Sequence, residues 1–211
     1  MSPSAYYSSA APSPRCSPFV SAIEDVRRRL ATRRPVEAPP EPGAQPAAVA
    51  LILHEGKDGL EALFIKRAVR PGDPWSGQVA FPGGRRDAAD ADLLATAIRE
   101  TREEVGVELR DATLLGALDD LQPRTPTLPP VVVRPFVFAV PARPELATNE
   151  EVQRAFWVPL RRLANPEVHR EVTLTLRGEQ RTFPAYNLGD DVIWGMTERI
   201  LTPFVEMIGE A

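Results

Sequence analysis

The sequence predicts a mixed α/β sandwich, in which helices cover a sheet that contains both parallel and antiparallel strands. Apolar runs of strand length alternate along the 211 residues with amphipathic segments of helix length. Turn residues join several of the neighbouring strands directly, so we expect hairpins rather than a regular series of β-α-β units. A chain of this length is sufficient for one full-sized domain with its own hydrophobic core.

The first 45 residues are expected to form a leader, and residues 46–211 the domain. Residues 1–18 contain few apolar side chains to offset the entropy of ordering, so disorder is predicted there. An amphipathic helix that packs on or caps the domain is expected over 19–32, where Phe19, Ile23, Val26 and Leu30 recur at helical spacing. The proline-rich segment 35–46 is expected to be a semi-rigid connector.

The domain itself is expected to begin with two strands joined by a short turn. The predicted strands are 47–54, 60–67, 78–81, 109–118, 131–140 and 155–158, with a hairpin formed by 171–176 and 181–185. Helices are predicted over 91–105 and in a short turn at 160–163. A closing helix is expected over 191–207, with inward-facing Ile193, Ile200, Leu201 and Phe204.

Composition excludes several classes of function. The net charge of −4 gives no general attraction to nucleic acid, and no apolar run reaches the length of a membrane span. The chain has too few soft ligands for a zinc site, with one cysteine, Cys16, and two histidines, His54 and His169. Because a single cysteine cannot form an internal disulfide, a reducing cytoplasm is the expected location. Neither a P-loop nor a dinucleotide-binding glycine motif is present. Any catalytic chemistry must therefore use carboxylates, arginines and hard metal ions.

Three glutamates are expected to share one face of the helix over 91–105. Glu100, Glu103 and Glu104 are separated by three and four residues, which places them on one side of the helix. They could form an ordinary solvated face, in which Arg99 pairs with Glu103. Three like charges would instead favour a bound cation, and Mg²⁺ prefers such oxygen ligands. The opposite side, which is expected to face the core, consists of Leu94, Ile98, Thr101 and Val105.

A pair of glycines precedes this helix and favours the metal-binding interpretation. Gly83 and Gly84 follow the predicted strand at 78–81, and adjacent glycines let the backbone turn sharply and approach a ligand closely. An ordinary turn between a strand and a loop is the alternative. At the other end, Gly106 occupies the position where a left-handed residue ends a helix.

The stretch Phe81-Pro82-Gly83-Gly84, followed by 99–107 (Arg-Glu-Thr-Arg-Glu-Glu-Val-Gly-Val), resembles the signature motif of the Nudix hydrolases. Thr101 stands where that motif usually has an aliphatic residue. The spacing to Arg99 is one residue longer than usual, and Asp87, Asp90 and Asp92 surround the place of a customary glutamate. The resemblance covers 78–107 in detail and 47–163 in arrangement. It implies a Nudix-type α/β/α sandwich with a mixed central sheet.

The resemblance also implies roles for individual residues in a hydrolase that cuts a diphosphate linkage with Mg²⁺ or Mn²⁺. Glu103 and Glu104 would be the principal metal ligands, with the Gly84 carbonyl beside them. Glu100 would be a further ligand or the base, and Arg99 would orient the carboxylates. A later acid often completes such sites, for which the candidates are Glu150 and Glu151.

Upstream of the motif, the sequence is similar to the coenzyme A diphosphatase branch of the family. Arg67 and Gly77 fit the pattern of that branch, whereas Asp73 occupies the place of its second arginine and the loop is one residue longer. Residues 193–197 also look like its closing segment. The resemblance implies cleavage of coenzyme A or acyl-CoA to 3′,5′-ADP and (acyl-)4′-phosphopantetheine. The residues expected to contact substrate are Arg67, Arg70, Phe81 and Gly83, with Arg134 as a further cation for a phosphate.

Two alternatives remain open at this stage. The substrate could be another nucleotide, such as ADP-ribose, NADH or a nucleoside triphosphate. The domain could also be a non-catalytic nucleotide-binding module, since fold does not fix function. The expected partner is in each case a small nucleotide, with no nucleic acid or membrane involved, and the chain is expected to be a monomer or a homodimer.

Overall fold

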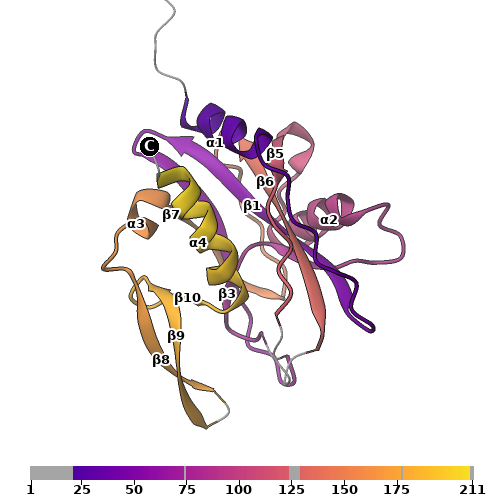
Figure 1. Ribbon diagram of the computed structural model, residues 1–211, viewed down its shortest axis with the longest axis vertical. Coiled ribbons are helices and arrows are strands. Elements are labelled where there is room, and N and C mark those ends of the chain that lie inside the picture. The colour runs from indigo at the N-terminus through magenta and orange to yellow at the C-terminus, as the bar shows by residue number, and fades with distance from the viewer. Residues whose placement is uncertain (1–20, 74, 124–128, 177, 210–211) are drawn as a thin grey trace, which may run out of the picture.

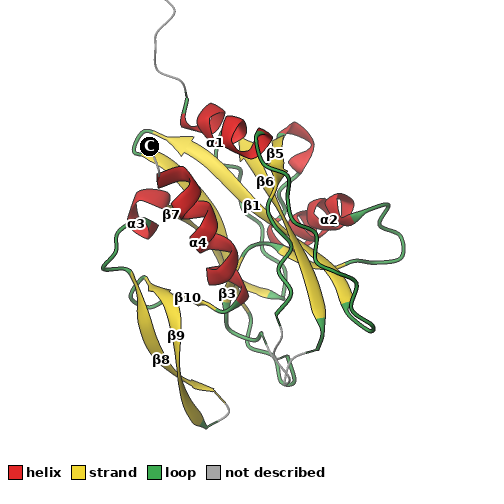
Figure 2. Ribbon diagram, in the orientation of Figure 1, coloured by secondary structure: helices red, strands yellow, loops and turns green. Residues whose placement is uncertain are grey.

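The computed structural model describes residues 21–73, 75–123, 129–176 and 178–209, and shows a twisted sheet with helices on both faces (Figures 1 and 2). The predicted mixed α/β sandwich is confirmed. The helices are α1 (Ala22–Ala31), α2 (Leu93–Val105), α3 (Leu160–Leu163) and α4 (Met196–Gly209), with a short 3₁₀ turn at Leu109–Asp111. The strands are β1 (Gln45–Gly56), β2 (Gly59–Arg67), β3 (Val79–Ala80), β4 (Gly83–Arg85), β5 (Thr113–Ala117), β6 (Val131–Val140), β7 (Val152–Pro159), β8 (His169–Leu176), β9 (Glu179–Asn187) and β10 (Val192–Trp194).

The long strand β1 organises the central sheet. It runs parallel to β6 along its length, from Gln45 beside Val131 to His54 beside Val140. Its other edge is shared: β2 pairs antiparallel with its C-terminal part, and β4 pairs antiparallel with its N-terminal part. Phe81 and Pro82 lead the chain into β4. Here the Ala50 amide of β1 donates a hydrogen bond to the Pro82 carbonyl at 2.8 Å. Strand β4 is thereby fixed to the centre of the sheet.

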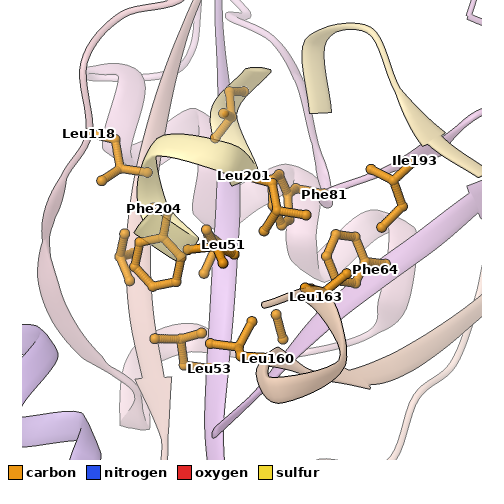
Figure 3. Packing of buried hydrophobic residues seen from close by; sticks show 14 of the residues in the cluster. Leu51, Leu53, Phe64, Phe81, Leu118, Leu160, Leu163, Ile193, Leu201 and Phe204 are labelled. Carbon is orange, nitrogen blue, oxygen red and sulfur yellow. The ribbon is translucent and has the colours of Figure 1, made fainter. Parts of the chain in front are cut away.

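Two hydrophobic cores, one on each face of the sheet, account for the sandwich. One core joins α1, α3 and α4 to the sheet, and Figure 3 shows Phe204 and Leu201 of α4 beside Leu51 of β1. The other core lies under α2, where Ala97 and Val105 pack against Ile52 and neighbouring strand residues. Alternation of side chains along β1 and β6 supplies both cores, because successive residues of a strand point to opposite faces.

The helix predicted before the domain is present as α1. Val26 and Leu30 are buried against the sheet, and Glu55 at the end of β1 accepts hydrogen bonds from the Ser21 hydroxyl and the Ala22 amide. The predicted packing role is therefore confirmed for this helix. Its expected first residue, Phe19, and the predicted disordered residues 1–18 lie outside the described residues. In the described parts of the chain, no helix is long and apolar enough to cross a bilayer.

Two sequence-based expectations were wrong in detail, and one alternative is excluded. The closing helix begins at Met196, and the segment before it is the strand β10, so Ile193 is buried from a strand. The strand expected over 109–118 starts with the 3₁₀ turn and is regular only over β5. Gly83 and Gly84 lie in the short strand β4, and the alternative of a simple turn is excluded.

A second, three-stranded sheet contains the predicted hairpin. Strands β8 and β9 pair antiparallel from His169 beside Tyr186 to Leu176 beside Glu179, and β10 continues the sheet beside β9. The hairpin is thus confirmed and is longer than expected, although Arg177 at its turn is outside the described residues. Figure 1 shows it extending from the body of the molecule below α3 and α4.

Candidate active site

The orientation of helix α2 is fixed at both of its ends. Asp92 caps the N-terminus, where its carboxylate accepts from the Ala95 amide at 2.7 Å. Gly106 ends the helix in the left-handed conformation, with φ of 71°, as predicted. Between these ends Thr101 is fully buried, and its hydroxyl donates to the Ala97 carbonyl at 2.7 Å. Because Thr101 satisfies its hydroxyl within the helix, it can replace the aliphatic residue of the family motif.

Glu104 lies against the sheet, which corrects the expectation that the three glutamates share one face opposite the core. Its side chain is only 2% exposed, and its Oε2 accepts from the Gly83 amide at 2.8 Å. Burial raises the pKa of Glu104 to about 8, although the Gly83 amide and the Arg67 guanidinium, 3.6 Å away, oppose this shift. The backbone amide of Gly83 in β4 therefore fixes the position of this carboxylate under the helix.

Glu100 occupies the space that a side chain at Gly84 would fill. A Cβ built on Gly84 would lie 2.5 Å from the Glu100 carboxyl carbon and from its Oε1. The Glu100 side chain is 17% exposed, and burial raises the pKa of its carboxyl. The second glycine therefore seats this carboxylate against β4, next to the partly exposed backbone of the glycine pair.

Arg99 connects the carboxylates of α2 to the preceding loop. It binds Asp90 through two hydrogen bonds of 2.9 and 3.0 Å, and it also contacts Glu100 at 2.8 Å and Glu103 at 3.0 Å. The hydrogen bonds from Arg99 hold the pKa of Asp90 well below its usual range and raise that of Arg99. Of the three aspartates near the expected acidic position, only Asp90 is buried, so it is the one that fixes Arg99.

Glu103 takes a different position from the other two glutamates. Its side chain is 47% exposed, and its carboxylate pairs with Arg99 rather than facing the cavity beside the glycines. The solvated i,i+4 pair that the sequence also allowed is thus present at this residue. The role of a metal ligand for Glu103 stays a prediction, and it would require the Arg99 contact to rearrange.

A cavity of about 470 Å³ adjoins these carboxylates. Its floor is apolar and comes from neighbouring residues of β1 and β6, and the start of α4 lines another wall. Its polar walls contain four carboxylates: two from α2, one that precedes β7, and Asp73. The lining residues that the sequence predicted are Arg67, Phe81, Gly83, Gly84, Glu100, Glu104 and Glu151; those that it did not predict include Trp75, Arg85, Met196 and Ile200.

The expected cationic residues differ in what they already bind. Arg67 lines the cavity and pairs with Asp73 at 3.0 Å, so the aspartate that replaces the second arginine of the family pattern becomes its partner. Arg70 lies outside the lining and pairs with Glu150 at 3.3 Å and Glu151 at 2.9 Å. These pairs leave neither arginine a free cation in this arrangement.

Glu150 and Glu151, the candidates for the additional acid, differ in how far their side chains are exposed. Glu151 lines the cavity, whereas the Glu150 side chain is 91% exposed and lies outside the lining. Arg134, considered as a further cation, also lies outside and binds Asp120 at 2.8 and 2.9 Å. The structure therefore brings Glu151, and neither Glu150 nor Arg134, to the same cavity as Glu100 and Glu104.

The carboxylate oxygens of this site suit a hard divalent cation that would also bind phosphate oxygens of the substrate. Within the described ranges, no group of three His, Cys, Asp or Glu side chains is arranged to hold a metal on its own. Mg²⁺ commonly binds one or two carboxylates together with phosphate oxygens and water, rather than a closed protein cage. Glu100 is partly desolvated and Glu104 almost fully. Glu100 lies in the space beside Gly84, next to the backbone of that glycine. A bound cation would offset the cost of their negative charge.

The chain is similar to several known proteins. A family model described as NUDIX domain matches residues 44–176. The mitochondrial coenzyme A diphosphatase NUDT8 of Homo sapiens is 32% identical over 165 residues, which cover 76% of this chain and 69% of that protein. The uncharacterized Nudix hydrolase NudL of Photorhabdus laumondii is 33% identical over 134 residues, or 63% of this chain and 70% of that protein.

An uncharacterized protein of Schizosaccharomyces pombe is 38% identical over 130 residues, which are 59% of this chain and only 40% of that longer protein. Among solved structures, a MutT/nudix family protein from Enterococcus faecalis has a TM-score of 0.53 at 20% identity. That alignment covers 90% of this chain and 76% of the other. At this identity the similarity supports the fold.

Proposed function

This chain belongs to the NUDIX family and is a hydrolase of nucleotide derivatives, and on that premise we propose that its substrate is coenzyme A or an acyl-CoA. Hydrolysis of the diphosphate linkage would release 3′,5′-ADP and 4′-phosphopantetheine, acylated where the substrate is. One observation carries the chemical part of the proposal: Glu100, Glu104 and Glu151 line a single cavity with the glycine pair of β4.

The residues of the chain have distinct tasks in this proposal. Glu100 and Glu104, with the Gly84 carbonyl and with Glu103 as the further predicted ligand, would hold Mg²⁺ or Mn²⁺, which would neutralise the diphosphate and lower the pKa of the attacking water. The Gly83 amide orients Glu104, and Arg99 orients Glu100 through its fixed fork of donors. Glu151 is close enough to influence the pKa of both α2 glutamates, and we assign it the role of the later acid.

The shape and chemistry of the cavity support a substrate with one charged and one less polar part. Ala47 and Val49 of β1 lie beside Val133 of β6 on the face opposite α2, and Met196 and Ile200 of α4 are close to them. This apolar surface suits the pantetheine arm of coenzyme A, while the acidic wall accepts the cation and diphosphate. The similarity to NUDT8, named as a coenzyme A diphosphatase, supports the same substrate.

A substrate panel tests this function. Purified protein with Mg²⁺ or Mn²⁺ would be incubated with coenzyme A, acetyl-CoA, ADP-ribose, NADH and a nucleoside triphosphate, and products separated by chromatography. We expect the highest kcat/KM for coenzyme A or its ester, with 3′,5′-ADP as a product. Equal rates across the panel would contradict the assignment, and no turnover of any substrate would favour a binding module.

A matched pair of variants ties the activity to the site. Glu104→Gln keeps the size of the buried side chain but removes its charge, so turnover should fall by at least about a hundredfold. Glu108→Gln makes the same chemical change at an exposed residue shortly after α2. Glu108→Gln should therefore retain the rate of the unmodified protein, and a similar loss in both variants would exclude a specific role for Glu104.

A further inference from the structure

We propose that Trp75 and Arg85 form a clamp for the nucleobase of the substrate, which rests on the proposed nucleotide hydrolase function. Both residues line the cavity that holds Glu100 and Glu104. The Arg85 guanidinium carbon lies 5.8 Å from the centre of the Trp75 ring, over its face. An aromatic ring and a guanidinium are the two side-chain surfaces on which nucleobases stack.

The spacing of the two groups suits the insertion of a flat base. A base stacked between them needs about 3.5 Å on each side, or about 7 Å in total. The present separation of 5.8 Å would therefore have to increase by only about 1 Å. Arg85 is exposed and makes no ion pair among the described residues, so its side chain can move outward at low cost.

The backbone of Trp75 is held in place by its own loop. Its amide donates to the Asp73 carboxylate at 2.9 Å, and its carbonyl accepts from the Gln78 amide at 3.2 Å. The ring nitrogen Nε1 is buried and has no hydrogen-bond partner among the described residues. An indole N–H can only donate, so an acceptor on a bound nucleotide would satisfy it.

Both halves of the clamp are linked to the residues that carry the proposed chemistry. The Arg85 carbonyl accepts from Arg99 at 3.1 Å, and Arg99 also binds Glu100. On the other side Asp73 pairs with Arg67, which lies 3.6 Å from Glu104. A base held between Trp75 and Arg85 would consequently be positioned relative to both glutamates, which gives the clamp a role in placing the diphosphate.

The chain offers a matched control outside the cavity. The Arg143 guanidinium carbon also lies 5.8 Å from the centre of a tryptophan ring, that of Trp157, and neither residue lines the cavity. Arg143 is engaged by Glu61, unlike Arg85. Replacement of Trp157 therefore tests the loss of an equivalent ring and cation contact without any effect on the proposed clamp.

Binding of 3′,5′-ADP and of AMP, measured by fluorescence titration and calorimetry in metal-free buffer, tests the proposal without turnover. Trp75→Leu should weaken the binding of both nucleotides about tenfold, because the variant loses the aromatic ring on which the base stacks. Trp75→Phe should weaken them less, about threefold, since it keeps a ring and loses only the N–H. Arg85→Gln should weaken them about two- to fivefold. Trp157→Leu should have the affinity of the unmodified protein.

A second measurement separates base contacts from contacts to the rest of the substrate. In Trp75→Leu the inhibition constant of 3′,5′-ADP should rise about tenfold, while that of 4′-phosphopantetheine, which has no base, should not change. Unchanged affinity of Trp75→Leu for the nucleotides, in protein shown to be folded by its melting temperature, would overturn the clamp. Absence of turnover would instead refute the proposed function, and the metal-free titrations would still decide whether the clamp exists.

Discussion

Replacement of Gly84 by alanine should abolish most activity while leaving the fold intact. A Cβ at this position would lie 2.5 Å from the Glu100 carboxyl group, where an ordinary contact needs at least 3.4 Å. Glu100 must therefore move by about 0.9 Å, and a misplacement of about 1 Å in an active site can cost about a hundredfold in rate. That factor corresponds to about 2.7 kcal/mol of activation free energy.

Gly83→Ala provides the contrasting variant at the adjacent residue. Its Cβ would lie 2.3 Å from the Ala48 carbonyl oxygen and 2.6 Å from the Val49 Cα, and φ at Gly83 is +153°. Backbone atoms cannot move aside as a carboxylate can, so overpacking and backbone strain should together cost about 2–6 kcal/mol. The melting temperature should fall by about 10 °C, at about 2–4 °C per kcal/mol.

The two variants are compared by thermal unfolding and by metal-dependent hydrolysis of coenzyme A. Gly84→Ala should melt within about 3 °C of the unmodified protein and lose about a hundredfold in kcat. Full activity in folded Gly84→Ala would refute the argument that this glycine exists to seat Glu100. An unchanged melting temperature for Gly83→Ala would refute the close approach of β4 to β1.

Three further predictions concern the charged groups of the site. Arg99 holds the pKa of Asp90 well below its usual range, so Asp90 contributes stability that is present above about pH 4 and lost as the pH falls. Asp90→Asn should cost about 2–3 kcal/mol at pH 7, measured by urea unfolding, and should flatten the acid part of the stability profile; an unchanged profile would contradict the assignment. Burial raises the pKa of Glu104 from 4.5 to about 8, so metal-free protein should become less stable as the pH rises toward and through 8. Glu104→Gln should remove this loss in melting experiments with EDTA between pH 5 and 9, and persistence of the loss would point to another group. Finally, Glu151→Gln should lower kcat by at least about tenfold, whereas exposed Glu150→Gln should stay within about twofold; the reverse order would exchange their roles.

The sequence was sufficient to predict helix α2 and the glycine that ends it, because capping and periodicity are local properties. It was insufficient for the environment of Glu104. A helical wheel gives the direction of each side chain, but the burial of Glu104 depends on the strand β4, whose Gly83 amide donates to it. Tertiary contacts of this kind have no local signal, although two consecutive glycines were an indication that something approaches them closely.

The error at the closing helix has a different cause. Val192 to Trp194 is a short apolar run, and periodicity cannot distinguish a buried strand from the first turn of a helix over three residues. Its pairing with β9 decides the outcome, and that partner lies in a hairpin whose position the sequence does not give. Trp75 and Arg85 were missed for a related reason, since the loop and β4 come together only in the folded sheet.

The attachment of β4 along β1 separates the placement of the glycines from the placement of the helix that carries the glutamates. The glycines take their place from the sheet, and the helix takes its register from the bond between Arg99 and Asp90. The loop between them is closed by the Asp87 amide, which donates to the Asp90 carboxylate at 2.9 Å, so Asp90 links the course of the loop to the position of the carboxylates.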